Sequence, residues 1–99
     1  MKFEWDENKN ERNKKKHNVS FEEASSIFDD KNSLEQGAII RDEKRIIRVG
    51  KTATKLILLI VYTFRKAVIR IISARQASRS ERNAYIGNKL DQNSDEDES

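Results

Sequence analysis

The sequence contains no cysteine and no proline, and it has only one histidine and three glycines among its 99 residues. Without cysteine, a disulfide framework and a thiolate metal site are both excluded, and a reducing compartment suits the chain. With a single histidine, a transition-metal site would have to consist of carboxylates, so we expect no metal and no other cofactor. The length is enough for one small domain.

Long hydrophobic runs are also missing. The longest run covers residues 56–62, whereas a membrane-spanning helix needs about 20 apolar residues. The first residues, Met1 to Asp6, are not followed by the apolar stretch of a secretory signal. We therefore expect a cytoplasmic protein without a membrane partner.

Charge is plentiful and unevenly distributed. Residues 41–89 hold 13 bases and 3 acids, whereas residues 91–99 hold five acids and no base. Such a basic half favours a polyanionic partner, because each Lys or Arg placed on a phosphate releases a condensed counterion. The alternative is that these charges only keep the surface soluble.

Two helices are predicted in the first third of the chain. Asp6 is a suitable N-cap for a helix over residues 7–16. This segment has no apolar residue, so caps, charge pairs and polar contacts must hold it in place. Ser20 and Glu23 have the spacing of a capping box and start a second helix, whose apolar stripe is expected to supply much of the core.

Four short runs with the pattern of β-strands follow. They cover residues 34–40, 45–49, 56–62 and 68–74. Connections of about four to six residues make an antiparallel meander the simplest topology. The run 56–62 is apolar throughout, which predicts a central strand covered on both faces.

The remaining residues predict a helix and a tail. Ser78 and Glu81 repeat the capping-box spacing and start a third helix, which Gly87 is expected to end at about residue 86. Residues 91–99 are expected to form an acidic disordered tail behind a single domain over residues 1–90. The predicted fold class is α+β, with a small antiparallel sheet, two N-terminal helices and one C-terminal helix.

Histidine is the only side-chain type that ordinarily changes charge near neutral pH, which makes His17 a candidate for proton transfer. A structural role for a lone histidine is the alternative. On the predicted first helix, Lys9, Asn13 and Lys16 lie on the same face as His17.

A series of arginines follows the predicted strands and the third helix. Arginine binds phosphate with two parallel hydrogen bonds and can stabilise the charge of a phosphoryl transition state. The series consists of Arg48, Arg65, Arg70, Arg75, Arg79 and Arg82. Strict alternation places Arg70 and Arg75 on opposite faces of their strand unless the strand ends or bulges near residues 73–74.

Several motifs, in order, resemble those of the BrnT toxins. The N-terminal motifs are Phe3-Glu4-Trp5-Asp6, Lys9, Asn13, Lys16-His17, Val19-Ser20-Phe21-Glu22-Glu23-Ala24 and Phe28-Asp29-Asp30. The C-terminal motifs are Arg70-Ile71-Ile72-Ser73-Ala74-Arg75, Ala77, Arg79, Glu81-Arg82 and Tyr85. The resemblance therefore extends over residues 3–85.

The resemblance implies a ribonuclease toxin with a RelE-like fold that belongs to a type II toxin–antitoxin pair. Its partner would be a cognate BrnA-like ribbon-helix-helix antitoxin, through which the toxin reaches operator DNA, and RNA would be its substrate. The catalytic residues implied are His17, Arg70, Arg75, Tyr85 and Lys16, and the RNA-binding residues implied are Arg48, Arg65, Arg79 and Arg82. The family often has a glutamate immediately before the arginine that ends the central hairpin, whereas Phe64 precedes Arg65 here.

The residues named above suit metal-independent cleavage of RNA. The 2′-hydroxyl of RNA can attack the adjacent phosphorus, so the protein needs no nucleophile of its own. It must move two protons and stabilise the charge of the transition state. The rival interpretations are a non-catalytic nucleic-acid-binding module and a decayed toxin that retains antitoxin binding.

Overall fold

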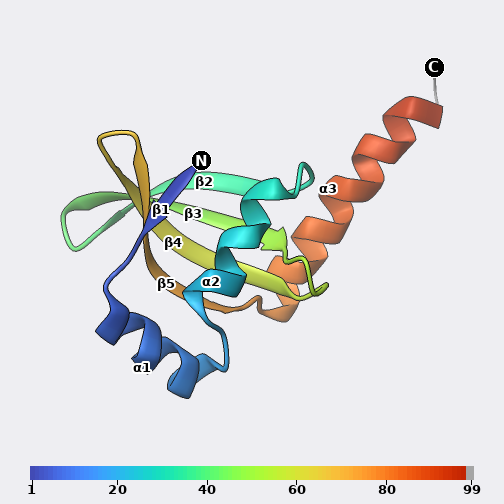
Figure 1. Cartoon of the computed structure of the whole chain (residues 1–99). Helices are drawn as coiled ribbons and strands as arrows, with labels where there is room; N and C mark the ends of the chain where they lie inside the picture. Colours follow the sequence, from blue (N-terminus) through green and yellow to red (C-terminus); the bar gives the residue numbers. More distant parts are fainter. Residues whose placement is uncertain (98–99) are drawn as a thin grey trace.

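A computed structural model describes the backbone of residues 1–97 and the side chains of residues 1–88. Its centre is a five-stranded sheet in the order β1-β5-β4-β3-β2 (Figure 1). The strands are β1 (Lys2–Glu4), β2 (Leu34–Ile40), β3 (Glu43–Lys51), β4 (Ile57–Arg65) and β5 (Val68–Gln76). The four strands that the sequence predicts are confirmed, and three of them extend beyond their predicted ends.

The first strand is a correction to the predicted sheet. β1 pairs with β5 in parallel, while the other neighbouring strands are antiparallel. The sheet is therefore mixed, and a strand precedes the helices. The pairing is stabilised by the side chain of Phe3, whose ring packs 5.2 Å from that of Phe28, a contact that only the folded chain can bring about.

The helices are α1 (Glu7–His17), α2 (Phe21–Ala24) and α3 (Arg79–Asp97), and a 3₁₀ helix, η1 (Ser25–Asp29), continues α2. The predicted caps are confirmed: Asp6 accepts hydrogen bonds from the backbone at the start of α1. Ser20 accepts one from the backbone N–H of Glu23. Within residues 1–97, no helix is both long and apolar enough to cross a membrane.

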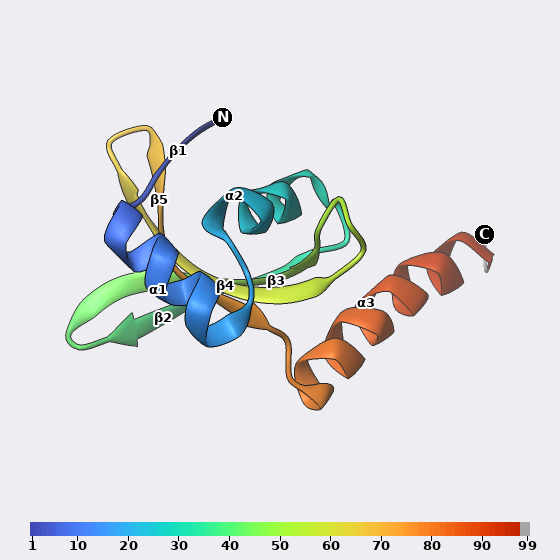
Figure 2. The same cartoon turned by 60° about the horizontal axis from the view of Figure 1, so that its bottom comes forward.

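α3 does not end at Gly87, so this part of the prediction is wrong. The helix continues to Asp97 and projects away from the sheet (Figure 2). No glycine in the described chain has a positive φ angle, so Gly87 does not adopt the left-handed conformation that ends a helix. The backbone of residues 91–97, where the sequence predicts a disordered acidic tail, is part of α3. The last two residues of that predicted tail, 98–99, lie outside the described residues.

The core lies between the sheet and the α2–η1 segment. Leu58 and Ile60 of β4 are fully buried there, together with Phe21 and Ile27. β4 is the central strand, as predicted. On its opposite face Ile57 is buried, whereas Val61 is only half-buried, so the expectation that both faces are covered holds at one end of the strand only.

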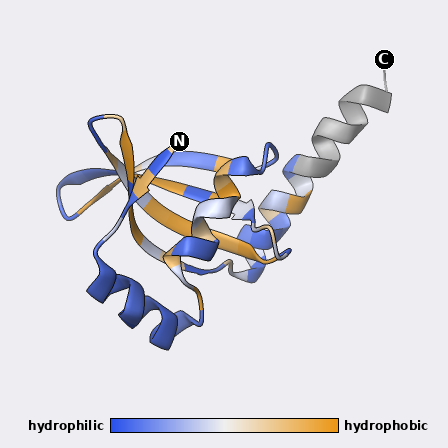
Figure 3. Ribbon diagram, in the orientation of Figure 1, coloured by the Kyte–Doolittle hydropathy of each residue, from blue (hydrophilic) through white to orange (hydrophobic). Residues whose placement is uncertain are grey.

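α1 is hydrophilic along its whole length (Figure 3) and is attached through polar groups, as the sequence predicts. The buried side-chain amide of Asn13 donates to the carbonyls of Val19, at 2.9 Å, and Ala74, at 2.7 Å. The side chain of Asn10 is also buried and accepts from the backbone N–H of Phe21 at 2.9 Å. These contacts place α1 alongside β5.

A bulge in β5 decides which face its arginines share. Val61 of β4 is paired with Ser73, but Tyr62 is paired with Ile71. Ile72 is thus an extra residue in β5, which shifts the alternation by one. The β4 residues paired with Arg70 and Arg75 are four positions apart, so they lie on the same face of the sheet. Arg70 and Arg75 consequently also lie on the same face.

Candidate nucleic-acid interface

A groove crosses the face of the sheet that α2 leaves open. It consists of two adjoining hollows of about 470 and 290 Å³ that share Lys9, Ile72 and Ser73. Besides these three, the lining residues are Arg12, Asn13, Lys16 and His17 from α1, and Ile40, Arg41, Glu43, Arg45 and Val61 from the β2–β4 region. We call this feature the basic groove.

The charge of the basic groove is mostly positive. Its permanently basic residues are Lys9, Arg12, Lys16, Arg41 and Arg45. The single carboxylate in its lining belongs to Glu43 and forms an ion pair with Arg45. A concave surface with this excess of cations attracts phosphate groups.

The local structure of α1 positions the cations of one wall. Asp6 accepts hydrogen bonds from the backbone N–H groups of Lys9 and Asn8, and these bonds hold the pKa of its carboxyl below the usual range. Asn18 takes a left-handed conformation, with a φ angle of 57°, and ends the helix. Lys16 and His17 lie in the last turn, where the helix dipole favours positive charge.

Arg70 and Arg75 lie on either side of the groove floor along β5, because Ile72 and Ser73 are between them in the strand. Each already has a partner. Arg70 forms an ion pair with Glu4 at 2.6 Å. Arg75 forms two parallel hydrogen bonds to Glu81, at 2.8 and 2.9 Å.

The pair with Arg75 lowers the pKa of Glu81 to about 2 from an ordinary value of 4.5. Because the folded protein holds this carboxyl ionised, the pair stabilises the fold above about pH 4.5, and this contribution is lost as the pH falls through about 2. We predict that, between about pH 4.5 and about pH 2, the free energy of unfolding decreases less in Glu81→Gln than in the wild-type protein. Urea denaturation at a series of pH values measures this difference. Arg75→Gln removes the same pair and should give the same result. If the free energy of unfolding decreases with falling pH as steeply in both variants as in the wild type, the prediction is wrong.

Arg48 lies on the other side of the sheet. It is paired in register with Ile60, which faces α2, and its guanidinium contacts Glu35 at 2.7 Å and the ring of Phe28 at 4.7 Å. Tyr62 donates to the same carboxylate, and burial together with this contact raises its pKa to about 12. The sheet therefore separates Arg48 from the basic groove.

Tyr85 is 2% exposed and does not line the groove. Its hydroxyl donates to Asp30 at 2.6 Å, so it attaches α3 to the end of η1. Burial, together with the Asp30 carboxylate, raises the pKa of Tyr85. Burial alone would raise the pKa of Asp30, but the hydrogen bonds from Tyr85 and the backbone of Lys51 lower it.

The structure thus divides the residues that the sequence singles out. Lys16 and His17 line the basic groove, and Arg70 and Arg75 flank its floor. Arg79 and Arg82 are exposed near the start of α3, and Arg65 is exposed at the end of β4.

Three cations of the groove are not among the site residues that the sequence patterns predict. The position of Arg12, three residues after Lys9 and four before Lys16, is a helical signal that could have identified it. Arg41 comes from the turn between β2 and β3, and Arg45 from the start of β3, and only the tertiary fold brings this hairpin opposite α1.

These features define a small α+β domain with a basic groove suited to phosphate groups. A family model described as "Ribonuclease toxin, BrnT, of type II toxin-antitoxin system" matches residues 5–81. The chain belongs to the BrnT family of ribonuclease toxins of type II toxin–antitoxin systems.

A solved structure shows the same fold. The chain is similar to the ribonuclease toxin BrnT of Brucella abortus, whose crystal structure was determined at 1.1 Å resolution. The TM-score is 0.60 at 22% sequence identity, and the match covers 80% of this chain and 99% of the Brucella chain. No curated protein sequence matches the chain significantly.

Proposed function

We propose that this protein is a metal-independent endoribonuclease that cleaves RNA in the basic groove and thereby inhibits translation and growth. The observation that carries the proposal is the position of His17 among Lys9, Arg12 and Lys16 on the wall of the groove. A proton-transfer group beside several fixed cations is the combination that phosphodiester cleavage requires.

The cleavage step uses the 2′-hydroxyl of the RNA as the nucleophile. Its oxygen bonds to the adjacent phosphorus while the bond from phosphorus to the 5′-oxygen breaks. One proton leaves the 2′-oxygen and another reaches the 5′-oxygen, and His17 performs one of these transfers. Lys16 is the candidate for the other transfer, and Arg70 and Arg75 stabilise the phosphate charge once RNA displaces their carboxylates.

The products test this mechanism. We expect the purified protein to cleave RNA in the presence of EDTA and to leave 2′,3′-cyclic phosphate and 5′-hydroxyl ends. Induction of the protein alone should arrest the growth of a bacterial host. Cleavage that requires Mg²⁺ and leaves 5′-phosphate ends would contradict the mechanism.

Two flanking arginines provide a second test. We predict that Arg70→Ala or Arg75→Ala lowers kcat/KM for RNA cleavage at least about tenfold, because each removes a charge directed at the transition state. Lys31→Ala is the control, since this exposed lysine lies in the turn before β2, outside the groove lining. Wild-type rates in both arginine variants would exclude these side chains from the site.

We also propose a cytoplasmic location, a RelE-like classification of the fold, and a BrnA-like ribbon-helix-helix antitoxin that links the toxin to operator DNA. A second candidate is a non-catalytic toxin module that binds nucleic acid and antitoxin. The ion pairs that neutralise Arg70 and Arg75 favour it. Such a module would protect RNA stoichiometrically and cleave none.

A further inference from the structure

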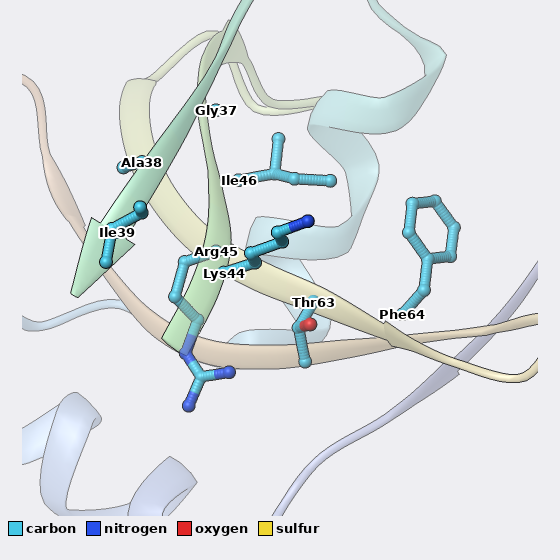
Figure 4. Close-up of a pocket in the computed structure, with 8 residues that line it drawn as sticks. All are labelled: Gly37, Ala38, Ile39, Lys44, Arg45, Ile46, Thr63 and Phe64. Atoms are coloured by element: carbon cyan, nitrogen blue, oxygen red, sulfur yellow. The ribbon is translucent and has the colours of Figure 1, made fainter. Parts of the chain in front are cut away.

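The β2–β3 and β4–β5 hairpins diverge at their tips (Figures 1 and 2). Register between β3 and β4 begins only at Ile46 and Tyr62, so residues 43–45 and 63–65 are not paired with each other. A hollow of about 590 Å³ lies at this point (Figure 4). Its lining consists of Gly37, Ala38, Ile39, Lys44, Arg45, Ile46, Thr63 and Phe64. We call it the hairpin fork.

Large apolar side chains are concentrated at the hairpin fork. Ile39 is 75% exposed and Phe64 is 55% exposed, and both line the hollow. Among the described side chains, the other exposed large apolar ones are those of Met1, Ile40 and Ile86. A small domain that leaves such side chains together on its surface has a surface suited to a protein partner.

The backbone at the hairpin fork is also available. Residues 43–45 of β3 are paired on one side with β2, and residues 63–65 of β4 are paired on one side with β5. The other side of each segment faces the fork. An unpaired strand edge can accept hydrogen bonds from, and donate them to, an added extended segment.

The charge at the hairpin tips selects the kind of partner. Residues 41–45 and 65–66 include five bases and two acids, and one of the acids, Glu43, is already paired with Arg45. A second copy of this chain would bring like charges together, which disfavours self-association. An acidic segment with apolar side chains is complementary to both the charge and the hollow.

RNA is a poorer match to the hairpin fork. Phe64 offers one ring for stacking, but Ile39 is aliphatic and provides neither a stacking face nor a hydrogen bond to a base.

We infer that the hairpin fork docks a segment of the cognate antitoxin, with apolar side chains in the hollow and flanking Asp or Glu residues on the hairpin tips. The identity of this partner rests on the proposed function. Arg45 lines both the hairpin fork and the basic groove. An antitoxin docked here therefore reaches the edge of the RNA-binding surface without having to fill it.

The experiment compares antitoxin binding and RNA cleavage in the same variants. Phe64→Ser and Ile39→Ser should each weaken binding of the purified cognate antitoxin at least about tenfold, while RNA cleavage by the free toxin stays within about twofold of wild type. Ile86→Ser is the matched control, because Ile86 is 44% exposed on α3, and it should change neither. Thermal unfolding of each variant verifies that the fold is retained.

Hydrogen exchange gives an independent measurement on the unaltered protein. Antitoxin binding should slow amide exchange in residues 43–45 and 63–65. Unchanged antitoxin affinity in both serine variants, or no added protection at these amides, would overturn the inference. If the serine variants lose RNA cleavage but bind the antitoxin as wild type does, the hairpin fork binds RNA instead. If the wild-type protein forms a dimer and the serine variants do not, the hairpin fork binds a second copy. If the wild-type toxin does not cleave RNA, the proposed function is refuted. Antitoxin binding by the serine variants then still tests whether the antitoxin docks at the hairpin fork.

Discussion

Replacing Asn13 with alanine is expected to lower the free energy of unfolding by about 3 kcal/mol or more. The amide of Asn13 donates to the carbonyls of Val19 and Ala74 and accepts, at 3.3 Å, from the backbone N–H of Ala74. Alanine leaves these three backbone groups without a partner, and each unsatisfied buried group costs about 1–3 kcal/mol. α1 has no apolar face that could compensate.

Urea denaturation followed by circular dichroism measures this effect. Asn8→Ala is the matched control, because Asn8 is an exposed asparagine of the same helix and its replacement should change the free energy of unfolding by less than about 0.5 kcal/mol. Equal losses in the two variants would show that the buried amide does not hold α1 in place.

The second large effect is expected from His17→Ala, which should lower kcat for RNA cleavage about 100-fold or more. A positioned proton-transfer group contributes roughly 10²- to 10⁴-fold to a rate. Since Lys9, Arg12 and Lys16 remain on the same wall of the groove, RNA affinity should fall much less than turnover. A loss confined to kcat identifies a role in the chemical step.

Single-turnover kinetics and an RNA-binding assay with the same oligonucleotide separate the two quantities. The pH–rate profile should also lose one of its limbs in the variant, which removal of a merely structural histidine would not cause. Lys15→Ala, on an exposed position next to the groove wall, is the control for general loss of charge. If His17→Ala cleaves RNA at the wild-type rate, His17 has no part in the chemical step.

The local elements of this fold follow from residues that are neighbours in the chain. Asp6 and Ser20 are helix caps whose side chains bond to backbone a few residues away, and such contacts depend on neighbours in sequence. The strand 34–40 was predicted with its observed ends, because its flanking residues interrupt the pattern. The need for polar attachment of the first helix followed from its composition alone.

How these elements meet depends on contacts between residues that are far apart in the chain. The bulge at Ile72 places Arg70 and Arg75 on one face, and no local signal specifies which residue of a strand remains unpaired. The opposite wall of the basic groove comes from the tip of the β2–β3 hairpin, about 30 residues from α1 in sequence. Strand register and the approach of distant segments depend on long-range packing. Which side chains line a groove depends in turn on the register of its strands and on the distant segments that approach it.

The same reason explains the residues whose surroundings the sequence did not reveal. Arg48 and Tyr85 have the chemistry of an RNA-cleaving site, yet they bond to Glu35 and Asp30, carboxylates that are distant in sequence. Residue type determines what a side chain can do. Burial and the choice of partner determine what it does in the fold, and both are properties of the assembled sheet and helices.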